Sequence, residues 1–164
     1  MSSHKSSFLV VIDGKVEGVY KELKEEHKKL RLIDYKGYLI MPGFNDLHCH
    51  ASQYQYRGTC FDVELMEWLD AHAFPEEAKF NDLKYAKKAY SIFVKDIKNS
   101  FTTRISLFAT LHKEATLELM DQLEKTGLVS YVGLVGMDRC VPDCVKQKNV
   151  ESASKDIEEY IKSS

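Results

Sequence analysis

Short apolar runs with the alternation of β-strands dominate the first forty residues of the chain. The runs at 8–13 and 16–20 meet at Asp13-Gly14, a dipeptide that supplies the positive φ angles of a two-residue turn. This pattern predicts a β-hairpin. Two further short strands are expected at 32–33 and 38–41, on either side of a Lys-Gly turn.

From residue 43 onward, buried strands alternate with amphipathic helices, in which apolar residues recur every three or four positions. A chain that winds strand, helix, strand, helix, strand forms a parallel, right-handed arrangement, so the fold class is α/β. We expect the helix stripes to pack on a core. The predicted elements are a strand ending at His48–His50, a helix capped by Asp62 and ended by Phe74-Pro75, a helix over 82–99, a strand over 102–109, a helix over 113–126 stopped by Gly127, a strand over 129–137 and a helix over 150–162.

Composition narrows the possible partners and compartment. With 164 residues, a net charge of −2 and 25 acidic against 23 basic residues, the chain has no electrostatic case for nucleic acid or an anionic membrane. The lysines of 21–31 are interleaved with glutamates, which indicates a solvated loop or helical turn. No apolar run approaches a membrane span, and the first residues lack the apolar core of a secretory signal. Four cysteines in such a chain indicate reduced thiols and a cytoplasmic protein.

The candidate chemistry lies at the end of the first long strand. Side chains alternate along a strand, so His48 and His50 point to one face, which Asp46 and Phe44 share. The other face is expected to hold Asn45, Leu47 and Cys49, packed against the helices. Two imidazoles can bind one divalent metal, although a catalytic zinc site usually has three protein ligands and a water. The alternative is a pair of hydrogen-bonded surface histidines.

The run M-P-G-F-N-D-L-H-C-H-A-S-Q, residues 41–53, resembles the first barrel strand of the amidohydrolase superfamily, whose pattern is P-G-x-x-D-x-H-x-H. Further segments are similar to the guanine deaminase family in the same order, from about Phe8 to Asp143. They are H-A-S-Q-Y at 50–54, F-D-V-E-L-M-E-W-L at 61–69, F-P-E-E at 74–77, F-A-T-L-H at 108–112, V-G at 132–133 and M-D at 137–138.

The resemblance implies a (β/α)8 barrel beside a small β-sandwich. A complete barrel takes roughly 250 residues, whereas about 122 follow Pro42, so we expect a fragment with a partial barrel of about three strands. The expected parts are residues 1–42 in the sandwich, 43–149 in the barrel and 150–164 as a terminal helix. The barrel face away from the helices is expected to carry Phe44 and residues drawn from Ile105, Leu107, Val132 and Leu134.

The resemblance also implies the reaction, a metal-dependent hydrolysis of guanine to xanthine and ammonia. One zinc or iron ion would be held by His48 and His50 together with a histidine and an aspartate from later strands. The catalytic acid–base carboxylates would lie in those later strands as well, so the fragment is expected to be inactive alone, and the complete protein to be a homodimer. Of the residues present, guanine would meet His50, Ala51, Ser52 and Gln53, Asp46 would orient an imidazole, and His112 could approach the pocket.

Two other functions stay open. The chain could be a non-catalytic remnant that binds metal or a partner, or a related amidohydrolase, such as a chlorohydrolase or cytosine deaminase, acting on another ring. Three departures from the family pattern favour relaxed constraint: Phe101 in place of glycine, Leu134 in place of lysine and Asn45 on the helix-facing side of its strand. The sequence assigns no role to the remaining histidines, His4, His27 and His72.

Overall fold

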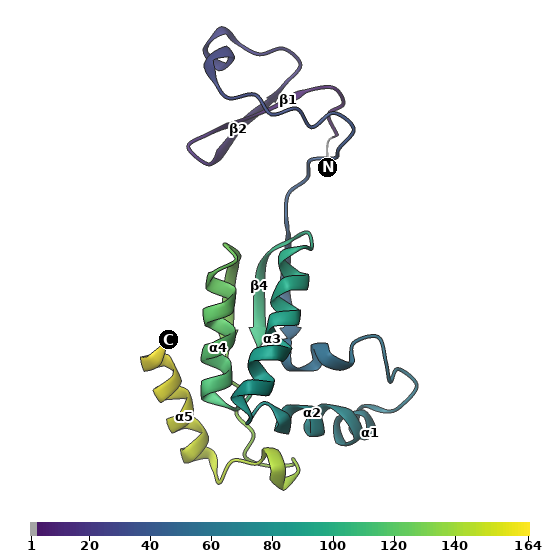
Figure 1. Cartoon of the computed structure of the whole chain (residues 1–164), viewed down its shortest axis with the longest axis vertical. Helices are drawn as coiled ribbons and strands as arrows, with labels where there is room; N and C mark the ends of the chain where they lie inside the picture. The colour runs from purple at the N-terminus through teal and green to yellow at the C-terminus, as the bar shows by residue number, and fades with distance from the viewer. Residues whose placement is uncertain (1–2) are drawn as a thin grey trace. The chain divides into compact units, whose positions relative to one another are not determined.

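The computed structural model describes residues 3–164, which divide into a unit that ends at Met41 and a second unit, Pro42–Ser164. Each unit has its own internal contacts. Figure 1 traces the chain through both units, from the N-terminal hairpin in purple to the last helix in yellow.

The first unit is built on the predicted hairpin. Strand β1 (Phe8–Ile12) pairs antiparallel with β2 (Lys15–Tyr20), and the register shifts between Val10 and Val11. Asp13 has φ 50° and Gly14 has φ 74°, the two positive angles that the turn requires. The chain then forms a short 3-10 helix, η1 (Glu25–Lys29). The hairpin prediction is confirmed.

The two further strands predicted at 32–33 and 38–41 were wrong. Among the described residues of this unit, only β1 and β2 form a sheet, and 32–41 is an extended or turn segment. The apolar side chains that suggested strands are exposed, with Leu32 at 70%, Tyr38 at 80% and Leu39 at 84%. A strand needs a partner for its backbone groups, and the hairpin does not supply one to this segment.

The second unit holds a three-stranded parallel sheet in the order β3-β4-β5, where β3 is Phe44–His50, β4 is Thr102–Phe108 and β5 is Val129–Gly133. Gly43 leads into β3, where a Cβ atom would lie 2.2 Å from Thr103 Cγ2. The glycine of the Pro-Gly pair is therefore needed for close approach of the two strands. Strand β5 ends four residues earlier than the predicted strand over 129–137.

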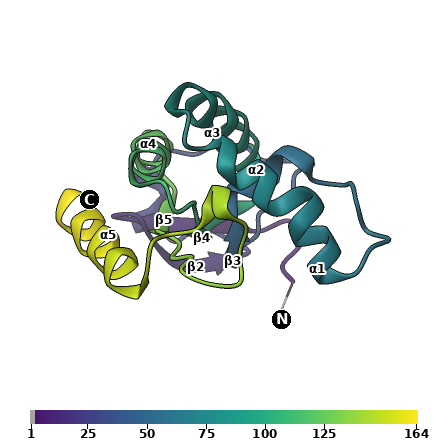
Figure 2. The ribbon, with the colours of Figure 1, turned by 90° about the horizontal axis from the view of Figure 1, so that it is seen from below.

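Helices α3 (Leu83–Lys98) and α4 (Lys113–Glu124) cover one face of this sheet, as Figure 2 shows. Their apolar stripes follow the predicted spacing, and the helix predictions over 82–99 and 113–126 are confirmed to within two residues. The largest fully buried side chains lie between helices and sheet: Tyr90, Phe80, Phe93, Ile105, Leu119 and Leu123.

Between β3 and α3 the chain first forms a 3-10 helix, η2 (Ala51–Tyr56), and then a non-helical stretch over 57–64. A continuous helical segment follows: α1 (Leu65–Trp68), a π-helical turn (Leu69–Ala73) and α2 (Phe74–Lys79). The prediction that Asp62 caps this helix was wrong, because the N-cap position is Glu64, without a side-chain cap bond. Phe74-Pro75 does not end the helix either. The wider turn at 69–73 comes just before Pro75, where a regular α-helical N–H would be missing.

The C-terminal part packs on the edge of the sheet. After a short 3-10 turn, η4 (Asp143–Val145), helix α5 (Val150–Ser163) begins at Asn149, whose side chain accepts a bond from the Ser152 N–H. The Tyr160 hydroxyl donates to the Val132 carbonyl at 2.6 Å. The Gln147 amide accepts from the Met137 N–H and donates to Asp156. These bonds fasten α5 to β5 and to the loop that follows it.

The face of the sheet away from α3 and α4 carries other residues than those predicted. Ile105 and Leu107, expected there, are 1% and 3% exposed and belong to the helix-facing core, against which Val132 also packs. The opposite face instead presents Phe44, Phe108 and Tyr131, which are 51%, 43% and 68% exposed. Alternation along β4 was read one residue out of step, and a one-residue shift moves every side chain to the other face.

Within the described residues 3–164, no helix combines the length and apolar character that crossing a membrane requires.

Candidate metal centre

His48 and His50 lie at the carboxyl end of β3 and face one another. Their ring centroids are 5.1 Å apart with the planes at 72°. Phe108, at the end of the neighbouring strand β4, lies 5.4 Å from the His48 ring and stacks on the His50 ring at 5.1 Å. The parallel sheet thus brings the ends of two strands together, and one aromatic side chain contacts both imidazoles.

The strand is irregular between Asp46 and Cys49, a stretch that includes His48. Asp46 is level with Ile105 and Cys49 with Leu107, so β3 carries one extra residue between them. At this bulge the simple alternation that the sequence predicts does not hold, since Leu47, expected against the helices, is 78% exposed. Asn45, which follows a second register shift between Phe44 and Asn45, is exposed as well. Cys49 does face the core, and burial raises the pKa of its thiol to about 11, with Asp46 adding to the shift. Bulges often re-aim side chains beside functional sites.

Asp46 bonds to the backbone of the strand at His48. Its Oδ1 accepts a hydrogen bond from the His48 backbone N–H at 3.2 Å. This bond stabilises the backbone at the bulge and so sets the direction in which the His48 side chain leaves the strand. In this geometry the carboxylate acts on His48 through the main chain.

The pair has the chemistry of metal ligands. Burial lowers the pKa of His50, and the neighbouring His48 lowers it further. A neutral imidazole is the form that binds a metal, because its free nitrogen carries a lone pair. Two ring nitrogens each at about 2.0–2.1 Å from one ion lie within a few ångströms of each other, which the two adjacent rings allow. The residues present therefore fit one zinc-like ion, with two ligands from this chain.

A hollow of about 350 Å³ opens beside His50. Gln53 and the aromatic side chains of η2 and α1 line it, and the Arg57 guanidinium stacks over the Tyr54 ring at 3.9 Å. The sequence prediction brought Gln53 to this place, next to a histidine. Ala51 and Ser52, predicted beside it, are 0% and 3% exposed and are not among the residues that line the hollow. Its lining residues are His50, Gln53, Tyr54, Tyr56, Arg57, Gly58, Thr59, Phe61 and Trp68.

A buried carboxylate lies under this segment. Glu77, 6% exposed on α2, accepts hydrogen bonds from the Ser52 hydroxyl, from the Leu111 N–H at 3.2 Å and from the Thr110 hydroxyl. Burial raises the pKa of Glu77, although these three donors act in the opposite direction. One side chain therefore joins the residues after β3 to the residues after β4, at the end of the sheet where the histidines lie.

Other residues of the predicted site are placed less directly. His112 precedes α4 and is half-buried; burial lowers its pKa, and among the described residues its Nε2 has no hydrogen-bond partner. It is not among the residues that line the hollow. His72 lies near the Tyr56 ring, at 6.3 Å between centroids. Burial also raises the pKa of Tyr56.

Sequence reasoning missed Glu77, Thr110 and Trp68 as members of this region, although all three stand in the segments on which the family resemblance rests. A glutamate pair after proline reads as the first turn of a helix, which favours acidic side chains at its N-terminus. Only the packing of α2 against η2 and the bond between Glu77 and the segment after β4 show that this side chain points inward.

Comparison with known proteins agrees with this geometry. No protein-family model matches the chain. It is 33% identical over 142 residues to guanine deaminase of Escherichia coli (strain K12) and 37% identical over 123 residues to that of Dictyostelium discoideum, spans that cover 85% and 75% of this chain. The crystal structure of guanine deaminase from C. acetobutylicum with bound guanine in the active site superposes with a TM-score of 0.89 at 46% identity, over 96% of this chain. The chain is homologous to guanine deaminase.

The homology covers a part of those proteins. The chain spans 32% of the Escherichia coli guanine deaminase, 27% of the Dictyostelium one and 37% of the C. acetobutylicum one. The α/β fold, with its parallel three-stranded sheet and covering helices, is thus that of a portion of guanine deaminase, as the sequence predicted.

Proposed function

We propose that this chain forms the part of a guanine deaminase that supplies two ligands of its metal centre and one wall of its guanine pocket. The observation that carries the proposal is the facing pair His48 and His50 at the end of β3, beside a hollow of about 350 Å³. Homology to guanine deaminases over most of the chain, one of them with guanine bound, supports the substrate.

Each residue has a distinct task in this proposal. His48 and His50 hold one zinc or iron ion, which, when bound, supplies a hydroxide nucleophile at neutral pH. Gln53 offers an amide with both donors and an acceptor, which suits the edge of a purine ring. Ala51 and Ser52 are buried residues that anchor the Gln53 segment in the core, and Ser52 bonds to Glu77. Asp46 sets the His48 backbone.

The chain alone is proposed to be inactive. Two histidines leave a catalytic metal with fewer than the usual three protein ligands, and the general acid–base carboxylate is expected from later strands. A partial (β/α)8 barrel, with the hairpin unit as part of a β-sandwich, and a homodimer of the complete protein belong to the same proposal. Four free cysteines, of which Cys140 and Cys144 are exposed, support a reducing, cytoplasmic location.

Xanthine formation from guanine tests this proposal directly. The chain alone with added zinc should give none. A chimera that joins it to the complementary part of the C. acetobutylicum enzyme should be active, and His48→Ala should abolish that activity. Lys148→Ala, an exposed change, is the matched control. A folded chimera without activity, or one that keeps full activity as His48→Ala, would contradict the proposal.

A non-catalytic remnant that binds metal is the second candidate. The irregularity in β3 and the exposed Asn45 are compatible with this function, because a chain that only binds metal does not need the exact geometry that catalysis requires. Under that function the folded chimera would bind zinc at His48 and His50 and form no xanthine.

A further inference from the structure

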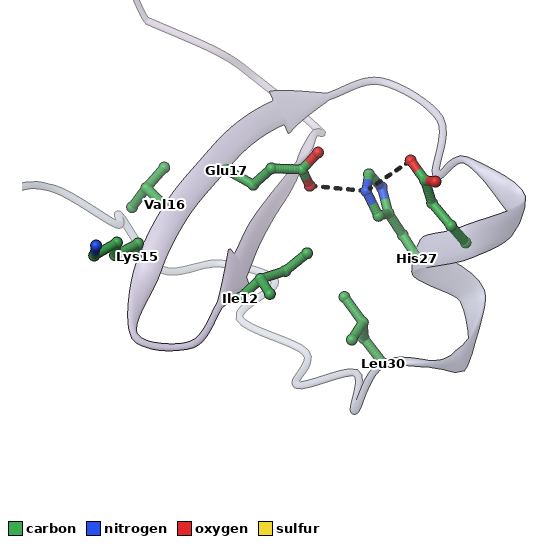
Figure 3. Close-up of a pocket in the computed structure, with 7 residues that line it drawn as sticks. Ile12, Lys15, Val16, Glu17, His27 and Leu30 are labelled. Carbon is green, nitrogen blue, oxygen red and sulfur yellow. Dashed lines mark ion pairs between the residues drawn. The ribbon is translucent and has the colours of Figure 1, made fainter.

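A second cluster of metal-ligating side chains lies in the N-terminal unit, away in sequence from the histidines of β3. Glu17 on β2 and Glu26 and His27 on η1 bring their ligand atoms within 4.8 Å of one another. Figure 3 shows the Glu17 and His27 side chains pointing toward each other, with the ion pairs of His27 dashed. Both residues belong to the lining of a hollow of about 490 Å³. The hairpin and the short helix thus build a site within one unit.

His27 is the unusual member of the cluster. It is 3% exposed, and within the described part of the chain neither of its ring nitrogens makes a hydrogen bond of suitable geometry, although Nε2 lies 2.8 Å from Glu17 Oε2. A buried polar group without a hydrogen bond costs on the order of 1–3 kcal/mol. A ligand on the lone pair of Nε2 would remove part of that cost.

The distances between donors fit a metal ion. In a tetrahedral site with bonds of about 2.0–2.2 Å, neighbouring ligand atoms lie roughly 3.3 Å apart. Nε2 of His27 is 2.8 Å from Glu17 Oε2 and 3.7 Å from Glu26 Oε1, and these values lie on either side of that spacing. Both His27 distances differ from that spacing by about half an ångström or less, and all three ligand atoms lie within 4.8 Å of one another. One imidazole and two carboxylates are a donor set that zinc accepts.

Tyr20 contacts two of the ligand side chains. The Tyr20 hydroxyl donates to Glu17 Oε1 at 3.2 Å, and its ring lies 5.1 Å from the His27 ring. Gly18 makes room for this tyrosine, because a Cβ at that position would lie 2.8 Å from the Tyr20 hydroxyl. Groups that orient ligand side chains in this way are a regular part of metal sites. The carboxylate oxygen that faces His27 is left available.

One cation already faces the cluster. Lys24 Nζ lies 3.9 Å from Glu17 Oε1 and 3.5 Å from Glu26 Oε1, and its side chain is 53% exposed. A lysine so exposed can swing into water when a divalent ion takes its place between the carboxylates. Lys24 therefore competes with the metal and weakens its binding.

We propose that Glu17, Glu26 and His27 form a second divalent-metal site of the zinc class, independent of His48 and His50. The role is structural: the ion joins the hairpin to η1. It goes beyond the proposed deaminase function and does not depend on it.

The test is a cobalt titration of the full chain as the double variant His48→Ala/His50→Ala, followed by visible absorption, with displacement by zinc. One equivalent should bind and give the intense bands of a four-coordinate cobalt ion. Glu26→Gln should weaken binding by at least about tenfold, a loss that even supporting residues around a metal produce. Lys24→Gln should strengthen it. Glu25→Gln, in the same helix but outside the cluster, should leave it unchanged.

His27→Gln should abolish binding, and its fold is checked by circular dichroism. Because replacing a buried histidine can unfold the unit, Glu26→Gln decides the outcome; Glu26 is 67% exposed, so its replacement does not disturb packing. Absence of cobalt binding by the folded double variant would overturn the proposal. Unchanged affinity in Glu26→Gln would overturn it as well.

Discussion

Glu77 shows how a single buried side chain can hold together the segments around a site. It takes hydrogen bonds from Ser52, Thr110 and the Leu111 N–H, so it ties the stretch after β3 to the stretch after β4. A carboxylate that is 6% exposed has a solvation cost, and here the cost appears as a raised pKa. We infer that Glu77 positions the segment that carries Gln53.

This role predicts opposite effects for two substitutions. Because the folded-state pKa of Glu77 is raised, the stability due to its protonated form is complete below the unfolded-state pKa of about 4.5 and is lost as pH rises through the folded-state value. Glu77→Gln, which is neutral and keeps an acceptor for the Leu111 N–H, should therefore gain stability relative to wild type between pH 4 and pH 7. Glu77→Ala should lose about 1–3 kcal/mol at both, because it leaves a buried donor unpaired.

Thermal unfolding of the three proteins at the two pH values measures these differences. A Glu77→Gln protein whose stability relative to wild type is independent of pH, or falls toward pH 7, would show that the buried charge is not the controlling feature.

At the scale of elements, two aspartates that both precede a helix in the sequence differ in whether they cap it. Asp82 is the N-cap of α3, and its side chain accepts from the Lys84 N–H at 2.8 Å. Asp62 precedes α1 without capping it, since the N-cap there is Glu64. Asp82→Ala should lower the free energy of unfolding by about 0.5–2 kcal/mol, whereas Asp62→Ala should change it by less than about 0.5 kcal/mol. Urea denaturation measures both, and equal losses would contradict the assignment.

Element prediction from the sequence succeeded where local chemistry decides the structure. The Asp13-Gly14 turn, the stripes of α3, α4 and α5 and the strand that ends in His48 and His50 all follow from period and turn residues. It failed where packing decides. The bulge before Cys49 exposes Leu47, the π turn lets the helix pass Pro75, and residues 32–41 form no strand without a partner.

The residues of the candidate site likewise fall into those that the sequence indicates and those that only the fold brings together. The histidine pair and Gln53 could be proposed from sequence, because the spacing of the histidines and one short motif single them out. Glu77, Thr110 and Trp68 could not, since they come from separate elements that only the fold brings together. The Glu17, Glu26 and His27 cluster was missed because a run of mixed charges indicates solvent exposure, whereas His27 is buried.

At the scale of the molecule, the exposed apolar surface of the second unit predicts association. Phe44, Leu47, Phe101 and Tyr131 are 51%, 78%, 71% and 68% exposed, and Phe44 and Phe101 contact each other edge to face. Soluble monomers rarely leave such side chains uncovered together, and strands at the edge of a sheet have unpaired backbone groups. We expect the mean mass of the chain in light scattering to rise with concentration.

Leu47→Lys should reduce that association, while Lys148→Ala, on the exposed surface outside this group, should not change it. A monodisperse monomer at all concentrations, with a sharp two-state melting transition, would show instead that the unit is self-sufficient.

The central claim is that His48 and His50 together hold one metal ion. Zinc titration of the chain with ¹⁵N-labelled histidine, followed through the ring nitrogens by NMR, tests it most directly. The ring signals of His48 and His50 should shift together with one common half-saturation point, and each should disappear from that titration when the other residue is changed to alanine. Signals of both residues that stay unchanged at saturating zinc, in a chain that is still folded, would contradict the account.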